Sequence, residues 1–332
     1  MLIPGHSPPP PFCKDITHIV GANCPMNQSR MFKALFNWLL WRQDLEKNDG
    51  GMAMADWRHM NAQELEEGFN PRASLGDEVN LLIGGWSERR NKVTAQLPGP
   101  FDLPYGPHDL ETFDLHPGQE GAPLIIFIHG GAWRALDKGH MNGHVFDLHA
   151  RGWHVANVNY PLCPDVSLTS LYQSLEQAVP AIFKACQDRD LLVGKVILAG
   201  HSAGGHAACW LATRPEIEPH VHGVFSVSGV YEMKPILSTS IQEDVLASDQ
   251  EIDELDLILH GRAPHPILAT MGADEPEAWL ASSRHWADHM KAQGGQVTLK
   301  AIAHTNHFTV MDESVATSSN AGEMLEEFVS GL

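Results

Sequence analysis

The feature that most constrains this chain is a short apolar segment that ends in a serine flanked by glycines. Residues 196–199 read Val-Ile-Leu-Ala, residues 200–204 read Gly-His-Ser-Ala-Gly, and the sequence after them is compatible with a helix. A strand that turns sharply into a helix holds such a serine in a strained backbone conformation, and small flanking residues avoid collisions with the neighbouring strand and helix. The pattern therefore predicts a nucleophilic hydroxyl, that of Ser202, at the end of a buried strand.

A second glycine motif follows an earlier apolar segment. Residues 124–128 read Leu-Ile-Ile-Phe-Ile, and residues 129–133 read His-Gly-Gly-Ala-Trp. Alone, two glycines after a strand indicate an ordinary tight turn. Together with the serine motif they predict an oxyanion hole, in which backbone N–H groups point at a developing negative charge. Its donors would be the N–H groups of Gly130, Gly131 and Ala203, the last at a helix start where amides are free.

Strands and helices alternate through the rest of the chain, in the order that builds a parallel sheet. Residues 60–90 have a helical pattern that is interrupted at Pro71. The predicted strands are 123–128, 154–159, 195–200, 222–228, 266–271 and 297–303, and the later predicted helices are 167–187, 204–213, 278–293 and 313–330. This order predicts an α/β protein with the α/β-hydrolase fold, a mostly parallel central sheet flanked by helices, with an N-terminal helical extension or cap. Functional residues of such sheets gather beyond the carboxyl ends of the strands.

The predicted hydrolase domain spans residues 56–332, and residues 1–55 are an N-terminal extension that we expect to be poorly ordered. Residues 31–41 of this extension are apolar and compatible with a helix. That segment would serve as a cap, an oligomer contact or a membrane-surface anchor, or would simply pack on the core. Residues 232–265 are rich in acidic side chains and are predicted to form a solvated, partly helical cap loop.

An activated serine needs a histidine as base and an acid that orients it, in the chain order serine, acid, histidine. Two histidines, His304 and His307, follow the last predicted strand. We prefer His307, because it lies further into the loop and just before the final helix. Two adjacent carboxylates, Asp274 and Glu275, follow the preceding strand. Because neighbouring side chains point in different directions, only one of them can hold the imidazole, and the residues alone leave the choice open.

The composition excludes some partners and suggests a compartment. The chain has 22 Lys and Arg against 41 Asp and Glu, a formal charge of −19, so no nucleic-acid partner is expected. Its five cysteines are an odd number without paired spacing, which suits a reducing compartment. No secretory signal pattern and no apolar run of roughly 18 residues is evident. We therefore expect a cytoplasmic protein without a membrane segment, and a homodimer stays open.

Several of these motifs together resemble one known family. The segments 129–133, 200–205 and 306–308 (Asn-His-Phe), with Tyr-Gly-Pro-His at 105–108, are similar to the kynurenine formamidase (arylformamidase) branch of the α/β-hydrolase-fold serine esterases and lipases. The resemblance covers roughly residues 56–330. It implies hydrolysis of an N-formyl aryl amide of the N-formyl-L-kynurenine type to formate and the free aryl amine, through a formyl-serine intermediate. It also favours Glu275 over Asp274 as the acid and places Trp279 at an aromatic position.

Other functions stay open at this stage. A carboxylesterase acting on small aryl or short-chain esters, or a xenobiotic amide or carbamate hydrolase, would use the same machinery. A silent hydrolase fold used for binding would lack reactivity at Ser202. His140 and His144 are four residues apart, but Gly143 intervenes and no His-Glu-x-x-His pattern is present, so no metal site is expected even with His149 nearby. No organic cofactor is expected, and Trp133 is predicted either to line the acyl pocket or to pack in the core.

Overall fold

The computed structural model describes residues 56–332, so the predicted extension over residues 1–55, with its apolar segment 31–41, lies outside the described residues. The described part is built on one eight-stranded sheet with the order β1-β2-β4-β3-β5-β6-β7-β8. The strands are β1 (Leu103–Pro104), β2 (Thr112–His116), β3 (Leu124–Ile128), β4 (His154–Val158), β5 (Val196–His201), β6 (Gly223–Val227), β7 (Ile267–Gly272) and β8 (Val297–Ile302).

Strand β2 runs antiparallel to β1 and β4, and every other neighbouring pair of the sheet is parallel. The six predicted strands are confirmed as β3 to β8. Strands β3 to β7 are buried along their whole length and β3 is apolar throughout, which is typical of parallel strands covered on both faces, whereas the edge strand β8 alternates between apolar and polar residues.

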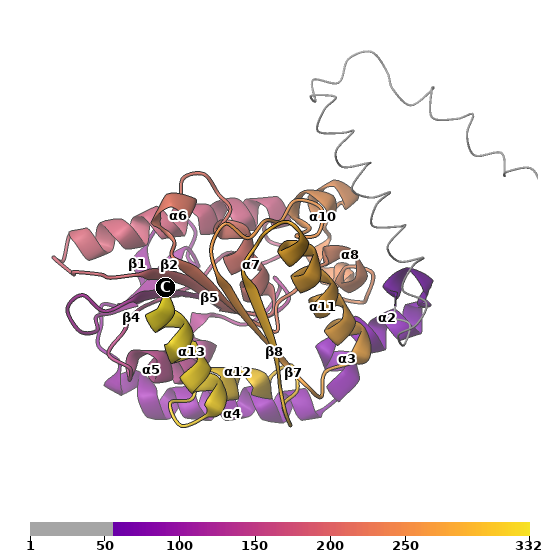
Figure 1. The fold of residues 1–332 in the computed structure, drawn as a ribbon, viewed down its shortest axis with the longest axis horizontal. Helices are drawn as coiled ribbons and strands as arrows, with labels where there is room; N and C mark the ends of the chain where they lie inside the picture. The colour runs from indigo at the N-terminus through magenta and orange to yellow at the C-terminus, as the bar shows by residue number, and fades with distance from the viewer. Residues whose placement is uncertain (1–55) are drawn as a thin grey trace, which may run out of the picture. The chain divides into compact units, whose positions relative to one another are not determined.

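Helices cover both faces of the sheet, as Figure 1 shows. One layer consists of α6 (Leu168–Gln187), α7 (Ala203–Leu211), α8 (Met233–Ile236), α10 (Asp249–Leu255) and α11 (Glu277–Ala292). The other consists of α4 (Glu78–Val93), α5 (Asn142–His149), α12 (Thr309–Val315) and α13 (Asn320–Gly331). The remaining helices are α2 (Ala62–Phe69), α3 (Pro71–Leu75), α9 (Gln242–Val245) and the 3₁₀ turns Trp57–His59, Thr94–Gln96, Lys138–Met141 and Glu218–His220.

Two hydrophobic cores result, one on each face of the sheet. In β3, Leu124, Ile126 and Ile128 point into the core under α6 and α7, whereas Ile125 and Phe127 point into the core under α4 and α5. Successive side chains of a strand alternate between faces, so a strand buried on both sides must be apolar throughout. This is the physical reason for the uninterrupted apolar run that precedes the glycine motif.

The predicted single helix over 313–330 is wrong, because the chain forms two helices there, α12 and α13. Ala316 adopts an extended conformation after α12, and the Ser319 side chain accepts a hydrogen bond from the N–H of Gly322 to begin α13. Serine and threonine at 317–319 favour caps and turns over helix interiors, because their hydroxyls compete for backbone groups. The interruption predicted at Pro71 is present: Asn70 ends α2 and caps α3, in which Pro71 is the first residue.

The segment 232–265 contains three short helices, α8, α9 and α10, and its acidic side chains Glu243, Asp249 and Asp253 are exposed. Its apolar side chains turn inward, so that Ile236 and Ile241 are buried. Between residues 56 and 332, no helix has both the length and the apolar character that crossing a bilayer requires.

Candidate active site

Ser202 lies in the sharp turn between β5 and α7. Its φ of 55° falls in the left-handed region that L residues rarely adopt. The flanking glycines are required by space: a Cβ on Gly200 would lie 2.2 Å from the carbonyl oxygen of Gly204, and one on Gly204 would lie 2.1 Å from that of Ile128. The turn is therefore pressed between its own helix and the adjacent strand β3, and the serine is held at the carboxyl edge of the sheet.

The loop after β8 brings a histidine to this serine. The Nε2 of His307 lies 3.0 Å from the Oγ of Ser202, and its Nδ1 lies 3.0 Å from Oε2 of Glu275. Glu275 and His307 are both buried, 5% and 4% exposed. The other candidate histidine, His304, is exposed in the turn that follows β8.

The structure brings Glu275 to the histidine and leaves Asp274 in solvent. Oε1 of Glu275 accepts a hydrogen bond of 2.6 Å from the N–H of Gly272, which draws the carboxylate back over the end of β7. Asp274 is exposed and contributes only its backbone N–H, to the carbonyl of Thr305. Asp274, kept open by the sequence as an alternative acid, does not contact His307, because adjacent side chains of this turn point to opposite sides.

Sequence reasoning missed a second serine at this site. Ser228 directly follows β6, is fully buried, and adopts a φ of 44°. Its Oγ lies 2.8 and 2.7 Å from the two carboxylate oxygens of Glu275 and 2.9 Å from Nδ1 of His307. The available signal was positional: Ser228 ends a predicted strand, at the sheet edge where polar side chains gather.

The glycine loop after β3 has an unusual backbone. Gly131, Ala132 and Trp133 have φ values of 114°, 50° and 61°, and a Cβ on Gly131 would lie 1.9 Å from the carbonyl oxygen of Ala135. Within residues 56–332 the N–H groups of Gly131 and Ala203 have no hydrogen-bond acceptor. Strained residues of this kind persist only where the surroundings hold them.

Trp133 helps to hold the strained backbone of the glycine loop. It also packs in the core and lines the pocket, the two positions predicted for it. Its Nε1 donates to the hydroxyl of Tyr172 at 3.0 Å, and its carbonyl accepts from the N–H of Cys163 at 2.9 Å. The side chain is buried in the core, and it also lines the pocket beside Ser202. A Cβ on Gly130 would lie 3.2 Å from Cβ of Ser202, so the loop lies directly against the serine.

His201 and His129 are buried on either side of this turn, and burial favours the neutral form of both side chains. Burial lowers the pKa of His201 to about 3 and that of His129 to about 4. Nε2 of His201 donates to the carbonyl oxygen of His307 at 2.7 Å, which fixes the backbone of the histidine loop. His129 stacks on Tyr160 with ring centroids 4.2 Å apart.

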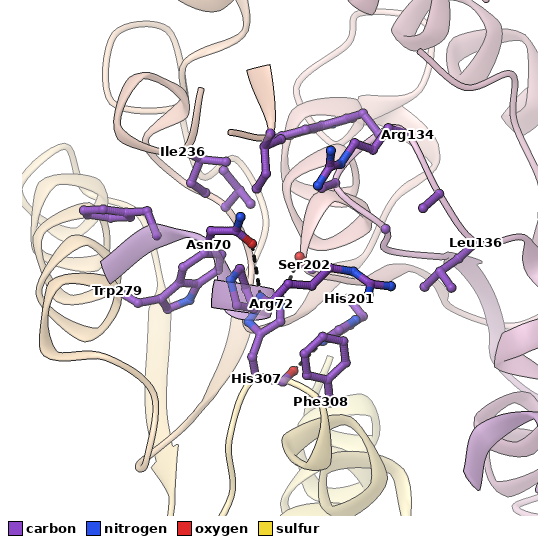
Figure 2. A pocket seen from close by; sticks show the side chains of 18 of the residues that line it. Asn70, Arg72, Arg134, Leu136, His201, Ser202, Ile236, Trp279, His307 and Phe308 are labelled. Carbon is purple, nitrogen blue, oxygen red and sulfur yellow. Dashed lines mark hydrogen bonds between the residues drawn. The ribbon is translucent and has the colours of Figure 1, made fainter. Parts of the chain in front are cut away.

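A pocket opens beside Ser202 and His307 (Figure 2). Its wall is mostly apolar and includes Phe69, Ile83, Leu136, Val230, Ile236, Ile241, Trp279 and Phe308. Trp279 packs edge-on against His307 with ring centroids 4.6 Å apart. The charged members of the wall are Arg72 and Arg134, which sequence reasoning also missed.

The three histidines weighed as metal ligands are engaged separately. His140 lies 2.9 Å from Asp137, Nε2 of His144 lies 2.8 Å from Asp312, and Nε2 of His149 donates to the carbonyl of Pro117. In the part of the chain that the structure describes, no three His, Cys, Asp or Glu side chains are grouped to hold a metal ion.

A mostly parallel sheet covered on both faces, with a strained serine turn after β5 and a histidine loop after β8, defines the α/β-hydrolase fold. Solved structures agree. A candidate thioesterase from a Silicibacter species has a TM-score of 0.66 at 25% identity, covering 79% of this chain and 99% of that one. Esterase B from Lactobacillus rhamnosis has a TM-score of 0.58 at 18% identity, covering 78% and 96%.

The sequence comparisons point to particular relatives within this fold. The family model described as BD-FAE matches residues 113–273. The kynurenine formamidase of Danio rerio is 26% identical over 284 residues, which cover 79% of this chain and 94% of that protein. The protein is a hydrolase of the α/β-hydrolase fold, and its resemblance to the kynurenine formamidases, predicted from its motifs, is confirmed.

Proposed function

We propose that the chain hydrolyses an N-formyl aryl amide of the N-formyl-L-kynurenine type, with Ser202 as nucleophile, His307 as base and Glu275 as the orienting acid. One observation carries the proposal: a single imidazole lies 3.0 Å from both the serine hydroxyl and the buried carboxylate. That is the geometry by which a histidine accepts the proton of a serine while a carboxylate fixes its tautomer. The formamide as substrate is supported by the similarity to the kynurenine formamidase of Danio rerio.

In the first half of the reaction, Nε2 of His307 accepts the proton of Ser202 as Oγ attacks the formyl carbon. The carbonyl oxygen becomes an oxyanion, and the N–H groups of Gly130, Gly131 and Ala203 donate to it. Each such donor contributes about 3 kcal/mol in measured hydrolases. His307 then protonates the departing aryl amine, which leaves more readily than an alkyl amine, and a formyl-serine ester remains.

In the second half, water takes the place of the amine. His307 accepts a proton from the water as its oxygen attacks the formyl ester, and the same N–H groups hold the second oxyanion. Collapse of this intermediate returns the proton to Ser202 and releases formate. The carboxylate of Glu275 accepts a hydrogen bond from the Nδ1–H of His307 throughout, so the imidazolium formed in each half-reaction is stabilised.

The test is release of formate and aryl amine from N-formyl-L-kynurenine by the purified chain. We expect turnover above the uncatalysed rate and a loss of about a thousandfold or more in kcat for Ser202→Ala. A fluorophosphonate probe should label the native chain and not Ser202→Ala. Labelling that persists in this variant, or full activity without the hydroxyl, would contradict the assignment of the nucleophile.

A carboxylesterase is the second candidate, favoured by the likeness to an esterase structure and by the mostly apolar pocket. The same residues would cleave a short-chain or aryl ester through an acyl-serine. Comparing kcat/KM for N-formyl-L-kynurenine with that for p-nitrophenyl acetate separates the two. An inert formamide beside rapid ester turnover would replace the first candidate with the second.

A further inference from the structure

Two arginines face the pocket in a chain that is otherwise strongly acidic. Arg72 is the second residue of α3, and Arg134 follows the glycine loop after β3; both line the same pocket as Ser202 and His307 (Figure 2). With 22 basic against 41 acidic side chains, the molecule as a whole repels small anions. The pair of guanidinium groups gives this pocket wall a local positive charge, which attracts anions.

The two arginines differ in how their charges are balanced. Arg134 forms an ion pair with Asp244, and its side chain is only 20% exposed. No carboxylate of residues 56–332 lies within ion-pair distance of Arg72. Its hydrogen bonds are made by the backbone alone: the N–H donates to Oδ1 of Asn70, and the carbonyl oxygen accepts from the N–H of Gly76. The guanidinium of Arg72 is therefore available to a ligand, unlike that of its neighbour.

The two charges are also close enough to affect each other. Burial, followed by the positive charge of Arg72, lowers the pKa of Arg134, while Glu66 and Glu243 act in the opposite direction. Like charges that face one cavity repel, and an anion placed between them removes the repulsion. Arginine suits this task, because its planar fork binds a carboxylate through two parallel hydrogen bonds.

The backbone that carries each arginine is fixed by hydrogen bonds. Asn70, 6% exposed, caps α3 through Oδ1, and its Nδ2 donates to Glu66 at 2.6 Å and to Ser240 at 3.1 Å. The N–H of Arg134 donates to the carbonyl oxygen of Gly131 at 3.1 Å, so this arginine belongs to the same turn as the glycine loop. A group bound by the arginines is thereby held at a defined distance from Ser202.

We propose that Arg72 and Arg134 form a carboxylate subsite, in which the two arginines bind the free carboxylate that the aryl formamide carries away from its formyl group. This inference rests on the proposed function. The apolar wall around Trp279 and Phe308 takes the aromatic ring, Ser202 faces the formyl carbon, and the arginines bind the carboxylate at the other end. A neutral short-chain ester would leave the subsite without a partner.

The kinetic test compares N-formyl-L-kynurenine with its methyl ester, which differs only in the charge of the carboxylate. We expect kcat/KM for the free acid to exceed that for the ester at least about tenfold, the effect of one or two charge-assisted hydrogen bonds. Arg72→Gln should bring this ratio close to one, and Arg134→Gln should lower it. Arg189→Gln removes an equal charge from the turn that follows α6, outside the pocket, and should leave the ratio unchanged.

A binding test separates this proposal from the proposed function. Calorimetric titration of the full chain with L-kynurenine and with its methyl ester needs no turnover. Binding of the acid at least about tenfold tighter, lost in Arg72→Gln, supports the subsite even if the formamide is inert. Equal binding of the two, or a selectivity that persists in both arginine variants, overturns the subsite even if N-formyl-L-kynurenine is hydrolysed.

Discussion

At the scale of single residues, the carboxylate of Glu275 is held by more than the histidine that it orients. It accepts hydrogen bonds from the N–H of Gly272, the hydroxyl of Ser228 and Nδ1 of His307. A buried carboxylate without such donors would be costly, and each donor also restricts where its oxygens can lie. Ser228 is therefore a positioning residue for the proposed triad.

Ser228→Ala should lower kcat by about tenfold and leave KM nearly unchanged, because the variant loosens Glu275 without touching the substrate. The rate of labelling of Ser202 by a fluorophosphonate should fall in parallel, since it depends on the same activated hydroxyl. Both are measured with whichever substrate the chain turns over best.

Ser314→Ala is the matched control for this variant. Ser314 is equally buried, and its hydroxyl has one protein partner, Thr270 at 2.9 Å. It should lose stability to a similar degree without a change in kcat. Equal losses of kcat in the two variants would show that Ser228 acts only through the stability of the fold.

The sequence identified the site residues that belong to local patterns and missed those that depend on contacts across the sheet. Ser202 and Gly131 could be predicted from the sequence, because a strained turn at the end of a strand requires small neighbouring residues. The residues alone left Glu275 and Asp274 open, because the choice depends on which side of the turn after β7 faces the histidine; only the resemblance to a known family favoured Glu275. Arg72 lies about 130 residues before Ser202, and only the folded chain brings it to the pocket.

At the scale of elements, the approach of α7 to β3 depends on a missing side chain. A Cβ on Gly204 would lie 2.1 Å from the carbonyl oxygen of Ile128, which is backbone and cannot turn aside. Gly204→Ala should therefore push α7 from the sheet and lower the free energy of unfolding by about 1–3 kcal/mol or more. It should also lower kcat, because Ser202 moves with the start of the helix; urea unfolding and steady-state kinetics measure the two effects.

Gly85→Ala provides the opposite case within the same molecule. Gly85 lies on the exposed face of α4, and a Cβ there meets nothing within 4 Å. Alanine should raise the free energy of unfolding by about 0.5–1 kcal/mol, because it restricts the unfolded chain and suits a helix interior. Equal effects of the two substitutions would show that crowding at Gly204 is relieved elsewhere.

A helix or strand could be predicted from the sequence where its apolar residues recur at a single regular spacing. The strands β3 and β7 are short, mostly apolar runs, the edge strand β8 alternates between apolar and polar residues, and α6 and α11 have a single apolar face. The final helix was predicted as one piece although residues 316–319 read Ala-Thr-Ser-Ser, a sequence that favours a break between two helices. The extended conformation of Ala316 ends α12, and the cap formed by Ser319 begins α13.

At the scale of the whole molecule, three fully buried histidines link the stability of the fold to pH. Burial lowers the pKa of His129 to about 4, that of His201 to about 3 and that of His206 to about 4, from an ordinary value of 6.5. In the unfolded chain these groups take up protons below pH 6.5, whereas in the folded chain they do not until the pH is far lower. Their contribution to stability is therefore complete above pH 6.5 and is lost as the pH falls toward 4.

His206 offers the cleanest test, because it lies away from the reacting atoms. Nδ1 of His206 lies 2.5 Å from the hydroxyl of Tyr172, and Nε2 donates to the carbonyl of Leu255 at 2.9 Å. Glutamine can accept and donate in similar directions but does not titrate.

His206→Gln should be less stable than the native chain at pH 7, and this difference should shrink by about 2–3 kcal/mol as the pH falls to 4.5. Urea unfolding at a series of pH values measures it, with His260→Gln, at an exposed position, as the variant whose difference stays constant. A difference for His206→Gln that does not change with pH would mean that the folded chain admits the proton as readily as the unfolded one, and the buried histidines would then have no part in its response to acid.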